Sequence, residues 1–126
     1  MIKSFSYEVV VAMFWVMKSL KNKPIVIEEI SEILHRLTVQ HQIETGASLR
    51  KVASGFWSED ASLFSGRFEL GGLSKDFKLN KKGLKFAVEV LIIDEALQNP
   101  IVFGEVSKII GFKLPNDFFE KLGERP

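Results

Sequence analysis

The sequence predicts an α+β fold that is mostly helical. Its 126 residues, of which 46% are hydrophobic and 11 are Phe, are enough for one domain with a substantial core. Apolar residues recur at helical spacing along most of the chain. Between Asp76 and Leu84 the pattern changes, because Phe77 and Leu79 alternate with charged neighbours as in a half-buried strand and a helical pattern follows at once. A hairpin that contains glycine is expected just before this junction, so strands accompany the helices.

Two helices are expected between Ser6 and Thr45. Ser6 is a suitable N-cap for the first helix, and the apolar residues of that helix share one broad face, formed by Val9, Val10, Met13, Phe14, Met17 and Leu20. Residues 21–24, with the sequence Lys-Asn-Lys-Pro, end this helix. Residues 24–27 form either a brief strand or an extended entry to the second helix. The second helix is expected to end between His41 and Thr45, and its apolar stripe consists of Ile30, Ile33, Leu34 and Leu37.

The next segment predicts a third helix and then a hairpin. Ser48 is expected to cap a short helix whose inward residues are Leu49, Val52, Ala53 and Phe56. Trp57 then either closes the core or lies exposed at a partner surface. Residues 62–80 predict the hairpin, with one strand up to Leu70, a loop over residues 71–76 and a return strand over residues 77–79.

The helix expected over residues 81–97 is apolar on nearly all sides. Asn80 is its expected N-cap. A helix that is covered on one side only carries fewer apolar residues, so we expect this helix to pack on the domain with one face and on a second subunit with the other. The expected dimer residues are Leu84, Val90, Leu91, Ile93 and Leu97.

A second copy of an earlier pattern follows this helix. Residues 100–110 repeat residues 24–34 in the form P-I-V-x-x-E-(I/V)-S-x-I-(I/L). The repeat indicates either an internal duplication or the common pattern of a helix that follows a proline-initiated turn. Gly111 is expected to end the second copy as a C′ glycine, and Pro115 is expected to begin a last short helix.

The junction at Asn80 resembles the one that follows the wing in winged helix-turn-helix proteins. The resemblance is carried by a strand, the capping Asn80, the basic pair Lys81 and Lys82, Gly83 and a long helix. It implies a winged-helix domain over residues 1–97 and a helical extension over residues 98–126 that packs on the same domain. In winged helices the third helix enters the major groove of DNA, so the resemblance also implies double-stranded DNA as a partner.

The charge distribution favours the middle of the chain as a binding site for a polyanion. The whole chain has a net charge of +1, but residues 35–85 carry nine Lys or Arg against five Asp or Glu. Residues 86–126 carry four against seven, a net charge of −3. The alternative to a binding surface is an ordinary solvated face. The candidate nucleic-acid-binding residues are Arg36, His41, Arg50, Lys51, Arg67, Lys75 and Lys78.

Several classes of function are disfavoured. The chain has no Cys, and the spacing of His35, His41 and Glu44 does not match a zinc motif, so we expect no metal site and no cofactor. No phosphate loop or nucleophile elbow is present, and we expect no enzyme. The longest apolar run, residues 9–17, is much shorter than the roughly 20 residues that a membrane helix needs, and we expect neither a membrane anchor nor a signal peptide but a cytoplasmic protein.

Two functions agree with these patterns. The first is a homodimeric DNA-binding transcriptional regulator with Arg50 and Lys51 in the groove and Arg67, Lys75 and Lys78 on the wing. The second is a winged-helix module that binds another protein through its apolar and acidic C-terminal third and does not bind nucleic acid. A basic third helix would favour the first function, and a neutral third helix with an apolar patch would favour the second.

Overall fold

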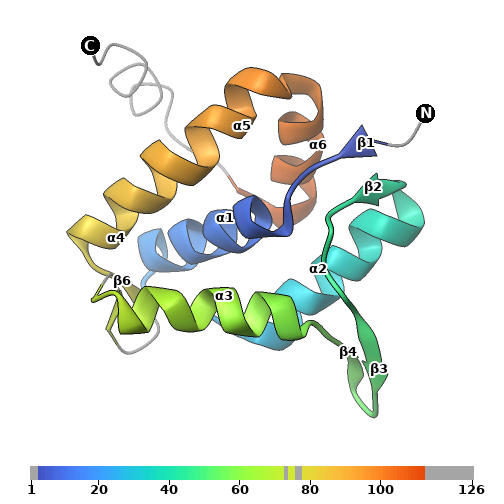
Figure 1. The fold of residues 1–126 in the computed structure, drawn as a ribbon, viewed down its shortest axis with the longest axis horizontal. Coiled ribbons are helices and arrows are strands. Elements are labelled where there is room, and N and C mark those ends of the chain that lie inside the picture. Colours follow the sequence, from blue (N-terminus) through green and yellow to red (C-terminus); the bar gives the residue numbers. More distant parts are fainter. Residues whose placement is uncertain (1–2, 73, 76–77, 113–126) are drawn as a thin grey trace.

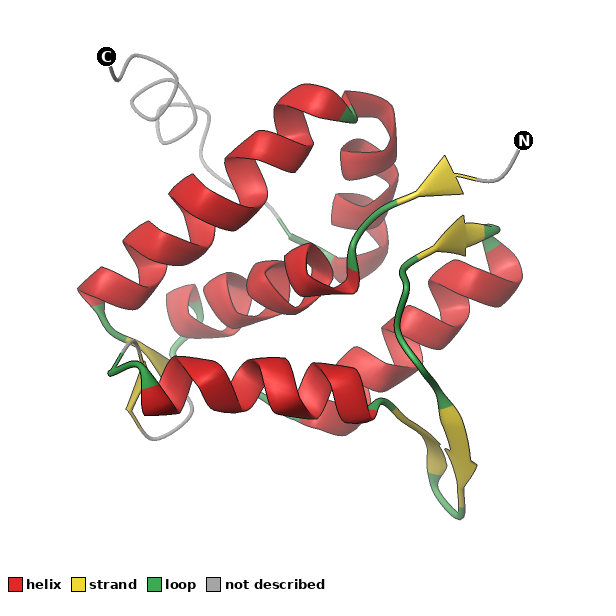
Figure 2. Ribbon diagram, in the orientation of Figure 1, coloured by secondary structure: helices red, strands yellow, loops and turns green. Residues whose placement is uncertain are grey.

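The computed structural model describes residues 3–72, 74–75 and 78–112, in which helices dominate and strands are short (Figures 1 and 2). The helices are α1 (Tyr7–Leu20), α2 (Ile27–Gln40), α3 (Glu59–Leu70), α4 (Lys81–Phe86), the π-helix η1 (Ala87–Ile92), α5 (Ile93–Gln98) and α6 (Pro100–Ile110). The strands are β1 (Lys3–Ser4), β2 (Ile43–Glu44), β3 (Arg50–Val52), β4 (Gly55–Trp57), β5 (Ser74–Lys75) and β6 (Lys78–Leu79). The predicted α+β class with mostly helical content is therefore confirmed.

Helix α1 is the centre of the molecule, and the other helices surround it in Figure 1. Every residue from Val9 to Met17 is buried. This follows from the sequence, because a helix that is apolar on all sides must be covered on all sides. The Ser6 side chain accepts a hydrogen bond from the Glu8 backbone N–H at 3.2 Å, so the predicted N-cap is confirmed.

Helix α2 packs on α1 through one stripe, as its sequence predicts. Ile30, Leu34 and Leu37 are buried. The helix ends at Gln40, and residues 23–26 enter it without forming a strand. Strand β2 then pairs in parallel with β1, which fixes the start of the chain beside the end of α2.

The prediction for residues 48–70 was wrong, because hairpin and helix occur in the opposite order. Residues 50–57, expected to be helical, form the antiparallel pair β3 and β4, and Gly55 adopts a φ of 138° that favours glycine. Residues 62–70, expected to be a strand, belong to α3. Ser58 caps this helix by accepting a hydrogen bond from the Ala61 backbone N–H at 3.1 Å. The backbone N–H of Ser48, the cap expected from sequence, instead donates to Asp60 Oδ2.

A hairpin before the long helix is present but shorter than predicted. Strand β5 occupies part of the expected loop and pairs with β6, with Ser74 opposite Leu79. Phe77 lies outside the described residues. Leu79 is buried, as expected. The Asn80 side chain accepts a hydrogen bond from the Gly83 backbone N–H at 2.8 Å, so this predicted cap is also confirmed.

The long helix predicted from residue 81 is continuous through α4, η1 and α5. Its inner face, with Gly83, Ala87, Val88 and Ile92, is buried and packs on α1. Helix α6 follows at Pro100 and packs on α1 and α2 through Val106 and Ile110. Gly111 has a φ of 75° and ends α6, as predicted for a C′ glycine. The helix expected from Pro115 lies outside the described residues.

Candidate interaction surfaces

The outward face of α3 is apolar and acidic. Leu63 and Leu70 are 63% and 91% exposed and lie two turns apart on the same side of the helix as Gly66. The charged residues of α3 are Glu59, Asp60 and Glu69 against Arg67, so the helix has a net charge of −2. This face carries one cation, Arg67, on a helix that is acidic as a whole, whereas a helix inside a DNA groove presents cations to phosphates.

A groove runs between α3 and the long helix beside this face. Its volume is about 320 Å³, and its lining residues are Glu8, Phe64, Arg67, Phe68, Phe86 and Leu91. The Phe68 and Phe86 rings meet edge to face with centroids 6.4 Å apart, which joins α3 to α4. Leu63 and Leu70 are not among these lining residues, but each lies one turn from Arg67 along α3. We call this site the α3–α4 groove.

The aromatic layer under the groove continues to Tyr7. The Tyr7 ring packs edge to face on Phe64 with centroids 6.5 Å apart. Burial raises the pKa of the Tyr7 hydroxyl above its usual value, and the nearby carboxylates of Glu8 and Asp60 raise it further. The hydroxyl is therefore neutral throughout the physiological range, and it adds no negative charge to the groove.

The structure separates the predicted nucleic-acid-binding residues into three groups. Arg50 and Lys51 lie exposed on β3, at the N-terminal end of α3. Lys75 and Lys78 lie on the hairpin at the other end of α3, about 18 Å away by the length of a 12-residue helix, and Arg67 lies in the last turn of α3. The two remaining candidates, Arg36 and His41, lie on α2 and at its C-cap. Arg50 and Lys51 therefore lie on a hairpin and not on the third helix, and Arg67 lies on the third helix and not on the wing.

A different basic cluster forms at the C-terminal end of α1. Lys78 Nζ donates a hydrogen bond to Asn22 Oδ1 at 2.8 Å, and the Leu79 backbone N–H donates to Ser19 Oγ at 2.9 Å. These bonds hold β6 against the turn that carries Lys21 and Lys23. Helix α4 begins beside β6, so the lysine corner, as we call it, consists of Lys21, Lys23, Lys78, Lys81 and Lys82. Sequence reasoning missed Lys21 and Lys23, because nothing in the local pattern reports a contact across 56 positions.

The expected dimer residues divide into two classes. Val90 and Leu97 are 56% and 76% exposed, whereas Leu84, Leu91 and Ile93 are half-buried within the chain itself. The long helix therefore covers its inner face with the domain, as predicted, and leaves an apolar outer stripe in the single chain.

Within the part of the chain that the structure describes, no group of three His, Cys, Asp or Glu residues is placed to hold a metal ion. Among the same residues, no helix has the length and apolar character that crossing a membrane requires. No protein family, curated protein or solved structure matches this chain.

Proposed function

We propose that this chain is a winged-helix-type interaction module that binds an amphipathic helix of another protein in the α3–α4 groove. The order of elements supports the winged-helix part of the proposal. Helices α1, α2 and α3 are followed by the β5–β6 hairpin and then by the long helix, as the sequence resemblance implies, but the third helix lies at residues 59–70 and strands β2, β3 and β4 stand between it and α2.

The observation that carries the proposal is the exposed apolar face of α3. Single exposed apolar residues are common, but here two share one face of α3, each one turn from Arg67, which lines a groove with an aromatic floor. An amphipathic helix fits such a groove with apolar residues at every third or fourth position. Arg67 and Glu8 line the groove with opposite charges and would orient the partner helix through polar contacts at its edges.

The experiment uses a displayed library of amphipathic helical peptides as the probe. Peptides selected on the wild-type chain are measured by isothermal titration against Leu63→Gln and Leu70→Gln. The control is Val39→Gln, because Val39 on α2 is 62% exposed and Leu63 is 63% exposed. We expect each Leu variant to raise the dissociation constant about tenfold, because the free energy that corresponds to this factor is roughly that of burying part of a leucine side chain. The control should bind as the wild type does.

Two outcomes would contradict this proposal. Selection could return no helical peptide, or the selected peptides could bind the Leu63→Gln variant as well as they bind the Val39→Gln control. Each variant changes only an exposed side chain, so thermal unfolding should show a wild-type fold in all three proteins.

The lysine corner supports a second candidate, a homodimeric DNA-binding regulator. Cations from two distant segments lie next to the hairpin that takes the place of the wing, which is where a winged helix contacts phosphates. In this candidate the lysine corner positions the duplex. The wing contacts that the sequence predicts are still made by Arg67, Lys75 and Lys78. Fluorescence anisotropy with a random duplex at low salt tests it, because the phosphate contribution to binding needs no specific operator.

A further inference from the structure

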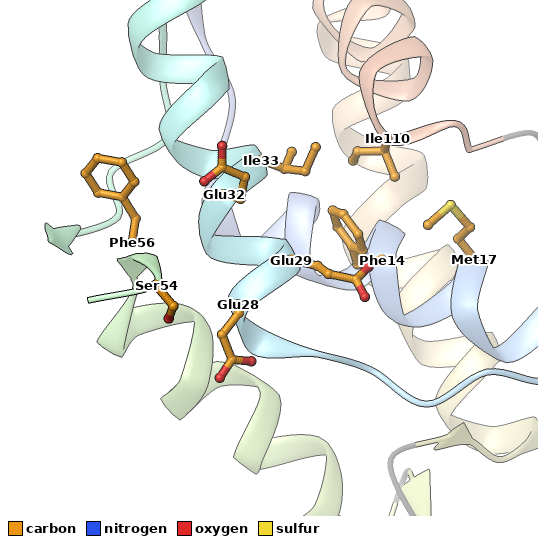
Figure 3. Close-up of a pocket in the computed structure, with 9 residues that line it drawn as sticks. All are labelled: Phe14, Met17, Glu28, Glu29, Glu32, Ile33, Ser54, Phe56 and Ile110. Carbon is orange, nitrogen blue, oxygen red and sulfur yellow. The ribbon is translucent and has the colours of Figure 1, made fainter. Parts of the chain in front are cut away.

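On the other side of α1, the molecule has a second concave site with a different character. The cavity has a volume of about 550 Å³ and lies between α1, α2, the β3–β4 hairpin and α6 (Figure 3). Its apolar surface comes from Phe14, Met17, Ile33 and Ile110 on the helices and from Phe56 on the hairpin. Glu8 lines the α3–α4 groove and Met17 lines this cavity. They are nine positions apart on α1, which places their side chains on opposite sides of the helix axis, so the two sites face different directions.

The rim of this cavity is strongly acidic. Glu28, Glu29 and Glu32, all in the first two turns of α2, line it, and in Figure 3 their carboxylates point in three different directions. Lys18 on α1 forms an ion pair with Glu29, with Nζ and Oε2 2.9 Å apart. Among the described residues, neither Glu28 nor Glu32 has an ion-pair partner. The rim therefore carries more negative charge than its own cation neutralises.

Stability of α2 alone does not account for this arrangement. A carboxylate in the first turn is favoured by the helix dipole, which explains Glu28 and Glu29. Glu32 lies one turn further along and is four residues from Glu28, and like charges at that spacing repel each other on a helix. A cation bound beside either carboxylate would reduce that repulsion.

The position of Glu32 is also linked to the hairpin. A Cβ atom added at Gly55 would lie 3.8 Å from Glu32 Oε2, so the turn of the hairpin comes close to this carboxylate. Next to it, the Phe56 ring stacks on His35 with centroids 3.6 Å apart, which fixes the aromatic ring at the edge of the cavity. Carboxylates beside an aromatic ring and an aliphatic floor match the chemistry of a cation carried on an apolar stem.

We infer that this acidic cavity docks a basic segment of a partner protein, whose lysine or arginine side chains lay their aliphatic stems on the apolar floor and place their charges on the carboxylates of the rim. The charge complementarity of rim and cation selects this occupant over an apolar helix or an anion. The inference is independent of the α3–α4 groove, because the two sites share no residue.

The test uses a short synthetic peptide in which arginine alternates with leucine, titrated into the full chain by calorimetry. We expect Glu28→Gln and Glu32→Gln each to weaken binding by about tenfold, and the double variant more, since each removes a charge-assisted contact. The matched control is Glu44→Gln, because Glu44 is also an exposed carboxylate but lies on β2, outside the cavity. A second peptide with 2,4-diaminobutyric acid in place of arginine should bind more weakly, because it keeps a cation but its shorter stem covers less of the apolar floor.

Every other outcome overturns the inference. Equal binding to the Glu28→Gln and Glu44→Gln variants would show that the peptide binds elsewhere. Binding of spermine or hexylamine without binding of the peptide would assign the cavity to free amines and not to a protein partner. The glutamine variants relieve a like-charge pair and leave the core unchanged, so circular dichroism should show an intact fold in each of them.

Discussion

At the scale of single residues, a buried hydrogen bond links two helices of the core. Trp15 on α1 is 1% exposed, and its indole N–H donates a hydrogen bond to Ser65 Oγ on α3 at 3.0 Å. The Trp15 ring also packs on Phe68 with centroids 5.2 Å apart. This pair therefore connects the central helix to the helix that borders the proposed binding groove, and Ser65 is itself only 5% exposed.

Replacing Trp15 with Phe should lower the free energy of unfolding by about 1–3 kcal/mol, because the Ser65 hydroxyl is left buried without a partner. Adding Ser65→Ala should recover part of this loss, since removing both polar partners is less costly than removing one. The control is Trp57→Phe, in which the lost bond joins a half-buried indole to the exposed Glu59 carboxylate, and a change below about 1 kcal/mol is expected. Urea unfolding followed by far-UV circular dichroism measures all of these, and similar losses for Trp15→Phe and Trp57→Phe would contradict the prediction.

At the scale of elements, the sequence predicted the helices whose apolar period and caps agree. Ser6, Asn80 and Gly111 mark helix ends in the sequence and in the structure alike. Helix α3 could not be recognised in this way. Its exposed Leu63 and Leu70 interrupt the division into an apolar and a polar face, so Phe64 and Phe68 read as part of a strand. The side chains that make α3 a candidate binding surface are the ones that concealed its helical period.

Asn80 connects the β5–β6 hairpin to the long helix and provides the element-scale prediction. Its Oδ1 accepts a hydrogen bond from the Gly83 backbone N–H, and its Nδ2 donates to the Gly72 carbonyl at 2.7 Å. Asn80→Ala should therefore lower the free energy of unfolding by about 1 kcal/mol, within the range of 0.5–2 kcal/mol typical of N-caps. Asn99→Ala is the comparison, because Asn99 precedes α6 without a side-chain capping bond; it loses only the hydrogen bond that Asn99 Nδ2 donates to Glu95 Oε2 at 2.8 Å, so it should cost less than Asn80→Ala. Chemical denaturation that gave the larger loss for Asn99→Ala would contradict this role for Asn80.

At the scale of the whole molecule, sites made by distant segments were beyond local sequence reasoning. Charge counting located the basic part of the chain, but it grouped Arg50 and Lys51 with Lys78 although α3 separates them. It also left out Lys21 and Lys23, which the contact between Lys78 and Asn22 brings next to β6. Hydrophobic periodicity indicates which face of a helix is buried but not which element packs against that face, so these packing partners became known only from the fold.

The outer stripe of the long helix predicts self-association. Val90 and Leu97 are exposed in the single chain, and burying them against a second copy would remove this apolar surface from water. Sedimentation equilibrium at micromolar concentration should give a two-chain mass, and Val90→Glu together with Leu97→Glu should shift it to one chain. Val39→Glu on α2 should leave the two-chain mass unchanged, because Val39 is similarly exposed but lies on a different helix. A wild-type chain that stays monomeric under these conditions would show that the stripe is not a dimer interface.

The dependence of duplex binding on salt separates the two proposed functions of the whole molecule. If Lys21, Lys23 and Lys78 each contact a phosphate, the logarithm of affinity should fall with the logarithm of salt with a slope of roughly −0.9 per contact. Three contacts would reduce the affinity of one chain by about fortyfold between about 50 and 200 mM salt, and that of a dimer on the order of a thousandfold. Lys78→Ala should lower the magnitude of the slope by about one per chain, whereas Lys108→Ala on α6 should not change it.

A change of slope in Arg50→Ala and Lys51→Ala but not in Lys78→Ala would place the duplex on the β3–β4 hairpin, at the other end of α3. If no duplex binds at about 50 mM salt and tens of micromolar protein, where even non-specific contacts are measurable, the lysine corner is an ordinary solvated face and the protein-binding role of the α3–α4 groove remains as the proposed function.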